Sequence, residues 1–295
     1  MTHSERLLRR PAVFRRLTGI TPDAFRSLLA DVERAWLDAR RRLGGHPGRK
    51  RKPGAGRKHA LALAERLLML LVYYRSYVSH AFLGVLFSLD PGNVSRNIAA
   101  LEPLLAGIFR IPERRVEARE DEVRELFFDA TERPTRRPRR RQRRWYSGKK
   151  KRHTLKNQAV VVRKRKRPGR RRAGAPPQKR RLRIAAVSRT APGSTHDKKA
   201  YDRARTLVPP GTRATGDTGY QGTALETPAR KPRGGALTRR QKRGNARISR
   251  RRIAVEHGIG KMKIWRIAGE RWRNPLRRHT LVIKNVAGLH NLMFA

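Results

Sequence analysis

The sequence predicts a multidomain protein with an all-helical N-terminal region and a layered α/β or α+β C-terminal domain. Up to about residue 105, apolar residues recur at helical spacing. After residue 125, short apolar segments of strand length alternate with helical ones, in the order three strands, helix, strand, helix. The 295 residues are enough for one large domain or two of ordinary size.

The N-terminal segment, residues 1–58, is predicted to contain one helix and a basic Gly/Pro linker. Thr21 and Pro22 provide a capping hydroxyl followed by a proline at the first helical position. One apolar face follows at helical spacing, made by Phe25, Leu28, Leu29, Val32, Trp36 and Leu37. The segment at 44–48, with three glycines and a proline, ends the helix. The basic linker at 49–58 is either a solvated connector or an arm that lies along phosphates.

Residues 59–112 have the pattern of a helix-turn-helix. Helices are expected at 61–74 and 79–87, and a third begins at Asp90, an N-cap residue followed by proline. On the third helix an inward apolar stripe leaves three polar side chains outside: Asn93, Arg96 and Asn97. Asn and Arg can read base edges with two hydrogen bonds, so this face suits a DNA major groove. A helical hairpin that binds nothing is the alternative.

The C-terminal domain is predicted from residue 113 to 295. We expect a charged helix at 113–125, and strands at 126–131, 157–162, 182–187 and 211–217. Helices are expected at 197–207 and 248–267. Between the second and third strands, the Pro-, Gly- and Arg-rich tract at 163–181 predicts a long basic loop.

The charge distribution indicates a polyanionic partner. The chain has a formal net charge of +52, and residues 133–295 contain 50 Lys or Arg residues but only six carboxylates. Such a surface favours nucleic acid, with affinity that falls steeply as salt rises. An anionic membrane is less suitable, because the longest apolar run, residues 67–74, is too short to span one. The absence of cysteine excludes disulfides and thiolate metal sites and fits a reducing cytosol, and the first ten residues show no secretory signal.

The scarce carboxylates are the informative residues. Asp129 ends an apolar strand, Asp217 precedes a turn, and Glu256 lies within a helix. Spacings of four and seven residues put Arg252, Glu256 and Lys263 on one helical face. Carboxylates from neighbouring elements can bind a divalent metal while cations beside them hold phosphates. For any single acid a salt bridge is the simpler interpretation, and we assign that role to Asp202, Glu226 and Glu270.

At these residues the chain resembles the DDE transposases of bacterial insertion sequences, in the group with a helix-turn-helix N-terminal domain. Five segments in the same order carry the resemblance: residues 128–134 (FDATERP), 146–154 (YSGKKKRHT), 192–199 (PGSTHDKK), 217–222 (DTGYQG) and 255–257 (VEH) with its flanking Arg and Lys. With the helical N-terminal half, the resemblance covers nearly the whole chain.

The resemblance implies a ribonuclease H-like mixed-sheet catalytic domain, in which Asp129, Asp217 and Glu256 bind Mg²⁺, with Mn²⁺ as a substitute. Arg252 and Lys263 would hold the transposon end. Six further residues would lie close to the substrate or the active site: Lys149, Lys150, Lys151, His153, His196 and Asp197. The implied activity is cleavage at the element's end to free a 3′-hydroxyl, which then attacks target DNA.

The partners implied are double-stranded DNA, as terminal inverted repeats and as target, and further copies of the chain in a dimer or larger assembly. The implied location is the bacterial cytoplasm. The sequence departs from the family at Ala130, where glycine is common, at Ser249, where tyrosine is expected, and in its long basic tract at 163–181. Two alternatives remain, a non-catalytic nucleic-acid-binding protein and an inactive transposase that only binds DNA. Convergence of the three acids would favour activity.

Overall fold

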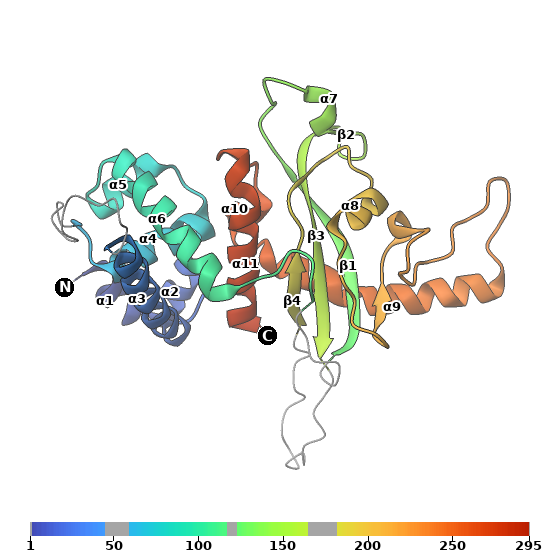
Figure 1. The fold of residues 1–295 in the computed structure, drawn as a ribbon, viewed down its shortest axis with the longest axis horizontal. Helices are drawn as coiled ribbons and strands as arrows, with labels where there is room; N and C mark the ends of the chain where they lie inside the picture. Colours follow the sequence, from blue (N-terminus) through green and yellow to red (C-terminus); the bar gives the residue numbers. More distant parts are fainter. Residues whose placement is uncertain (1, 45–58, 117–122, 165–181, 295) are drawn as a thin grey trace, which may run out of the picture.

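The computed structural model describes residues 2–44, 59–116, 123–164 and 182–294, which form a helical region and a sheet region side by side (Figure 1). The helical region contains α1 (His3–Leu8), α2 (Pro11–Thr18), α3 (Pro22–Gly44), α4 (Leu63–Ser76), α5 (His80–Phe87) and α6 (Pro91–Phe109). The linker at 49–58 and most of the basic tract, residues 165–181, lie outside the described residues.

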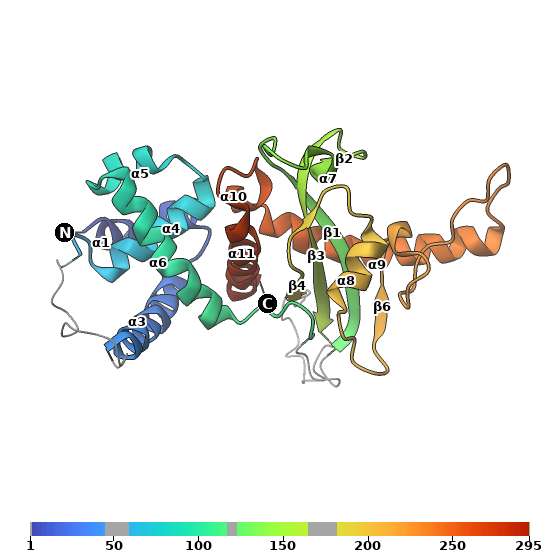
Figure 2. The same cartoon turned by 45° about the horizontal axis from the view of Figure 1, so that its top comes forward.

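The expected helices of the N-terminal half are present. Ser79 and Asp90 cap α5 and α6 by accepting hydrogen bonds from Phe82 N and Gly92 N. Of the apolar face expected on α3, Phe25, Leu28 and Val32 are buried and Leu29 and Trp36 are half-buried, but Leu37 is 53% exposed, so its assignment to the buried face was wrong. The last part of α3 has few neighbours to pack against, because the end of the helix extends past the other helices (Figure 2). The sequence pattern missed the two short helices α1 and α2.

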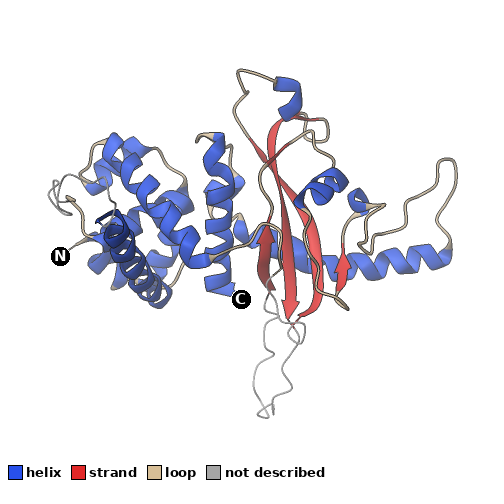
Figure 3. Ribbon diagram, viewed as in Figure 1, coloured by secondary structure: helices blue, strands red, loops and turns tan. Residues whose placement is uncertain are grey.

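The sheet consists of four main strands in the order β4-β3-β1-β6, and all strands of the described chain lie in this region (Figure 3). Strand β1 (Val123–Pro134) pairs antiparallel with β3 (Arg152–Lys164) and parallel with β6 (Arg213–Thr215), and β4 (Leu182–Val187) pairs antiparallel with β3. Short strands β2 (Tyr146–Ser147), preceded by α7 (Gln142–Trp145), and β5 (Ala191–Pro192) also pair with β3. All four expected strands are therefore confirmed, with longer bounds for β1 and β3 and shorter bounds for β6.

Strand alternation gives the sheet two apolar faces. Phe127 and Val161 face a core that includes Val255, Ile259 and Met262 of α9 (Arg239–Met262). On the opposite face, Phe128, Val160 and Val162 pack with residues of α8 (Asp197–Ala204) and of η1 (Thr218–Tyr220). The predicted stripe on α9 thus does pack on the sheet. The helix differs in its bounds from the expected 248–267, because a capping box at Thr238 and Gln241 starts it earlier.

The charged helix expected at 113–125 was wrong where the structure describes it. Residues 113–116 are not helical, and β1 already begins at Val123. The backbone at residues 112–114 instead accepts hydrogen bonds from distant segments: Leu207 N donates to Arg114 O, and Val187 N donates to Pro112 O. The carboxylate of Glu113 is held by Arg189 and Lys284 at 2.7 and 3.0 Å. These tertiary contacts outweigh the local helical pattern.

The C-terminal helix α11 (His279–Phe294) joins the two regions, since it packs against both α6 and β4 (Figure 2). It follows α10 (Arg266–Gly269) and η2 (Leu276–Arg278). One apolar cluster runs from the N-terminal helices through α11 to the α9 face of the sheet. None of the helices in the described part of the chain combines the length and hydropathy that a membrane crossing requires.

Candidate active site

Asp129 and Asp217 are neighbours because of the strand register. Strands β1 and β6 run parallel, with Phe127 opposite Thr215 as the last pair. Asp129 and Asp217 each lie two residues after this last pair, and neighbouring strands are only about 4.8 Å apart. Local backbone bonds orient both side chains, because Asp129 Oδ1 accepts from Ala130 N at 3.0 Å and Asp217 Oδ1 accepts from Gly219 N at 2.8 Å.

Asp197, at the start of α8, lies beside this pair. A Cβ atom built on Gly219 would lie 2.7 Å from Asp197 Oδ2 and 2.9 Å from Asp217 Oδ1, so both carboxylates approach the same glycine. A side chain at position 219 would have to displace them. His196, the residue before Asp197, caps α8 and is exposed. The structure therefore places Asp197 next to Asp217, and His196 lines a pocket together with Thr218 and Gly219.

The charges of this cluster perturb Asp129. The pKa of Asp129 is raised to about 6: burial raises it most, the guanidinium of Arg252 lowers it, and the neighbouring carboxylates of Asp217 and Asp197 also raise it. Three carboxylates this close together form a concentration of negative charge that a cation would relieve.

A buried lysine that the sequence analysis missed fixes one side of the cluster. Lys156 Nζ lies 2.9 Å from Asp197 Oδ1 and 3.1 Å from Glu132 Oε1, and it donates to Thr195 O at 2.7 Å. Lys156 and Glu132 are cross-strand partners on β3 and β1. Burial alone would lower the pKa of Lys156, but Asp197 and Glu132 hold it above its ordinary value. The signal in the sequence was one lysine inside a strand that is otherwise uncharged from residue 154 to 162.

Glu256, in contrast, is not brought to the aspartates. It lies exposed on α9, and within the described ranges no hydrogen bond or ion pair is found for its carboxylate. The residue of α9 that does reach the cluster is Arg252, whose Nη2 is 3.8 Å from Asp129 Oδ1. In the described part of the chain, no three His, Asp or Glu side chains are close enough together to hold a metal ion. Lys263 is exposed directly after the end of α9.

The three polar residues expected on the outer face of α6 differ in exposure and in their hydrogen bonds. Asn93 and Arg96 are exposed and bonded to each other, with Arg96 Nη2 donating to Asn93 Oδ1 at 2.9 Å. Asn97 is half-buried and its side chain is used internally, since its oxygen accepts from Arg66 and its amide donates to Asn93 O. The inward stripe of α6 is buried as expected, at Val94, Ile98 and Leu101.

The basic residues of the β2–β3 turn lie away from the aspartates. Lys149, Lys150 and Lys151 are exposed, and His153 packs edge-on against Tyr146. Asp129 pairs with Ala159, so seven residues of β3 separate its level from Arg152, roughly 20 Å at the rise of a strand. The β2–β3 turn extends from the far end of the sheet (Figure 1). A DNA molecule would have to cover both places to contact both.

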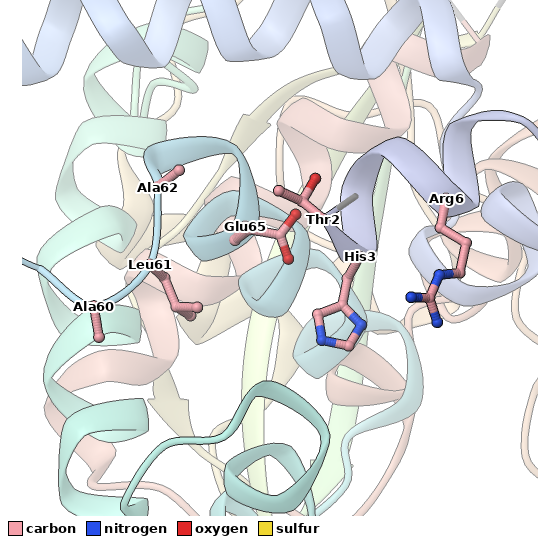
Figure 4. A pocket seen from close by; sticks show the side chains of 7 residues that line it. All are labelled: Thr2, His3, Arg6, Ala60, Leu61, Ala62 and Glu65. Carbon is pink, nitrogen blue, oxygen red and sulfur yellow. The ribbon is translucent and has the colours of Figure 1, made fainter.

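Two pockets accompany these features. One of about 360 Å³ adjoins the aspartates and is lined by His196, Thr218, Gly219, Ala229, Arg230 and Lys231. The other, of about 220 Å³, lies in the helical region between α1 and the start of α4 (Figure 4). Its most buried lining side chain is Glu65, which accepts a hydrogen bond from Ser4 N at 2.7 Å. The second pocket is therefore part of the packing of α1.

The fold and site combine a helix-turn-helix region with an acidic cluster in a basic sheet domain. Comparison with known families agrees. Residues 59–110 match the helix-turn-helix of DDE superfamily endonuclease, and residues 178–291 match the DDE superfamily endonuclease. Over these two ranges the chain is similar to DDE superfamily endonucleases and their helix-turn-helix region. The matched endonuclease range contains Asp217 and Glu256 but begins after Asp129.

Two curated relatives cover almost the whole chain. The chain is 28% identical over 290 residues to a probable transposase for insertion sequence element IS702 from Microchaete diplosiphon, covering 96% of this chain and 94% of the relative. It is 27% identical over 278 residues to a putative transposase for insertion sequence element IS112 from Streptomyces albus G, with 93% and 92% covered. No solved structure matches the chain significantly.

Proposed function

We propose that this chain is a DNA transposase that binds the ends of an insertion sequence and catalyses metal-dependent cleavage and strand transfer. The observation that carries the proposal is that Asp129 on β1 and Asp217 just after β6 are brought side by side by the parallel pairing of these strands, in a domain with a large excess of cations. The names of the two relatives and the endonuclease family support it. We propose double-stranded DNA as substrate and a dimer or larger assembly as the acting form.

We further propose that the sheet domain is ribonuclease H-like. In support, Asp129 lies on the first main strand, Asp217 follows the fourth, and Glu256 lies on the next long helix. This is the order of acids that the resemblance implies. We also propose that the domains divide after residues 58 and 112. The helix α11 belongs to the last domain in sequence but packs on both regions.

The aspartate cluster fits a divalent cation in its chemistry. Carboxylate oxygens are the ligands that Mg²⁺ and Mn²⁺ prefer, and Asp129 carries the raised pKa of a group crowded by like charges. Asp129 and Asp217 would hold the ion, which when bound would supply activation of the attacking oxygen and stabilisation of the leaving oxygen. Glu256 would join them only after a rearrangement of its side chain or of α9.

The other residues of the site act on the substrate or on the aspartates. Lys156 holds Asp197 in place through its 2.9 Å ion pair, so that Asp197 Oδ2 stays beside Asp217. Arg252 partly neutralises Asp129 in the free protein and is free to bind a phosphate if the aspartate takes a metal ion. Lys263, Asn93 and Arg96 are exposed, and their side chains would contact DNA through charge or hydrogen bonds.

A nicking assay tests the proposal. Supercoiled plasmid carrying the gene with its natural flanking DNA is incubated with the purified chain and Mg²⁺ or Mn²⁺, and 3′-ends are mapped. Wild type is expected to nick at the flanks, whereas Asp129→Asn and Asp217→Asn are expected to bind the DNA without nicking it. Binding without nicking by wild type in either metal would overturn the enzymatic proposal.

A second candidate is a transposase relative that binds DNA without cutting it, and the exposed position of Glu256 away from the aspartates favours it. The same assay separates the two, because this candidate predicts a wild-type protein that shifts the flanking DNA and leaves it intact in both metals.

A further inference from the structure

The pocket beside the aspartates has a basic wall that nothing in the site chemistry described above uses. Arg230 and Lys231 line it, both are exposed, and across the described residues neither has a carboxylate within ion-pairing distance. Thr218 and His196 add a hydroxyl and an imidazole. Two unpaired cations with hydrogen-bonding groups around a hollow of about 360 Å³ are suited to a phosphate oxygen cluster.

The pocket shares a wall with the aspartate cluster. Gly219 lines the pocket, and the same residue is approached by both Asp197 Oδ2 and Asp217 Oδ1. A nucleic-acid strand whose sugar-phosphate backbone passes the aspartates would therefore run directly into the pocket. Anionic groups of the strand are repelled by the carboxylates and attracted by the basic wall, so the pocket gives the backbone a fixed position next to them.

The basic wall is held from two sides. Asn245 of α9 makes two hydrogen bonds to the backbone of Ala229, accepting from Ala229 N at 2.8 Å and donating to Ala229 O at 2.9 Å. From the other side, Gln221 Nε2 donates to Pro228 O at 3.1 Å. Residues 228 and 229 directly precede the two cations, so these bonds limit where Arg230 and Lys231 can lie.

Asn245 stands out on its helix, since the other polar residues of the first half of α9 are mostly Arg and Lys. Asparagine is a poor helix former, and its amide can serve one backbone N–H and one backbone C=O together. The presence of asparagine at position 245 is therefore explained by its two hydrogen bonds to Ala229 and not by helix propensity.

We propose that this pocket binds a phosphate of the DNA strand beside the aspartate cluster through Arg230 and Lys231, and that Asn245 is the positioning residue of the basic wall. The proposal rests on the proposed function for its substrate. It names one phosphate-binding site within a surface where charge alone would allow many.

The test measures binding of the full chain to a fluorescent 20-base-pair DNA duplex by anisotropy, in EDTA, so that no cleavage is required. The double variant Arg230→Ala/Lys231→Ala is compared with Lys242→Ala/Arg243→Ala, an exposed Arg and Lys pair on α9 that lies outside the pocket lining. The pocket pair is expected to lose about tenfold in affinity near 0.1 M salt and to lower the salt slope by about one, whereas the control pair loses less than about threefold.

The positioning role is tested by combination. Asn245→Ala is expected to weaken binding of the wild-type chain severalfold but to change nothing in the Arg230→Ala/Lys231→Ala background, because the two act through the same wall. Ser249→Ala, an exposed polar residue of the same helix, serves as its control, and thermal unfolding shows that each variant is folded. Equal losses for the two double variants would overturn the pocket, and equal effects of Asn245→Ala in both backgrounds would overturn its positioning role. Both results are independent of whether wild type nicks DNA.

Discussion

The two parallel strands β1 and β6 and the helix α9 position their acids in different ways. Asp129 and Asp217 are brought together by hydrogen-bonded register between β1 and β6, and their side chains are oriented by adjacent backbone N–H groups. Glu256 sits on a helix that docks on the sheet through an apolar stripe, and its carboxylate is exposed. Backbone pairing fixes a side chain within a strand, whereas an apolar stripe leaves a helix freer to slide or rotate. The positions of two of the three proposed ligands, one on β1 and one just after β6, are therefore set by strand pairing, and the position of the third is not.

The largest expected effect comes from breaking the strand-borne pair. Asp129→Asn or Asp217→Asn keeps the shape of the side chain but removes a negative charge, and nicking is expected to fall on the order of 10³-fold. DNA affinity in EDTA should be kept or slightly raised, because a repulsive carboxylate is lost. Asp202→Asn, on exposed α8 surface, is the matched control and should leave the rate unchanged. Equal rates for Asp217→Asn and the control would contradict the assignment.

The next effect concerns the lysine that supports the cluster. Lys156→Met keeps the length of the side chain but leaves Asp197 and Glu132 partly buried without their cation. A buried pair broken on one side typically costs about 3–5 kcal/mol of unfolding free energy. Urea unfolding measures it, with Lys198→Met as an exposed control expected to change little. A cost near zero would mean that Lys156 is not the anchor of Asp197.

A smaller effect follows from the pKa of Asp129. Because burial raises that pKa from 3.8 to about 6, the folded protein carries a penalty for the charged carboxylate that is absent below pH 4 and complete above pH 6. Asp129→Asn removes the penalty, so it should unfold at higher urea than wild type at pH 8, by up to about 3 kcal/mol. The difference should disappear near pH 4. A difference that stays constant with pH would show that Asp129 is not perturbed.

Much of this arrangement was predictable from local patterns. The cap at Asp90, the strand that carries Asp129 and the apolar stripe of α9 follow from residue type and spacing. The proximity of His196 and Asp197 to Asp217 came from the family resemblance. These features depend on neighbours in sequence or on matched segments, so tertiary context did not alter them.

The features that sequence missed depend on contacts between distant residues. Lys156 meets Asp197 41 residues away, and Ala229 meets Asn245 on another element. The C-terminal helix α11 joins the two regions, and Asn97, expected to face DNA, instead bonds Arg66 from α4. No spacing rule reports such pairs. Only the packed chain shows which polar residues are used internally.

The most direct test of the account is Mn²⁺ binding to the free protein by calorimetry near pH 7.5. The account predicts that Asp217→Asn abolishes measurable binding, whereas Glu256→Gln changes the affinity by less than about threefold, because the exposed carboxylate of Glu256 stands apart from the aspartates. If Glu256→Gln removes binding as completely as Asp217→Asn, the helix-borne acid belongs to the metal site in the free protein and the contrast drawn between strand and helix is wrong.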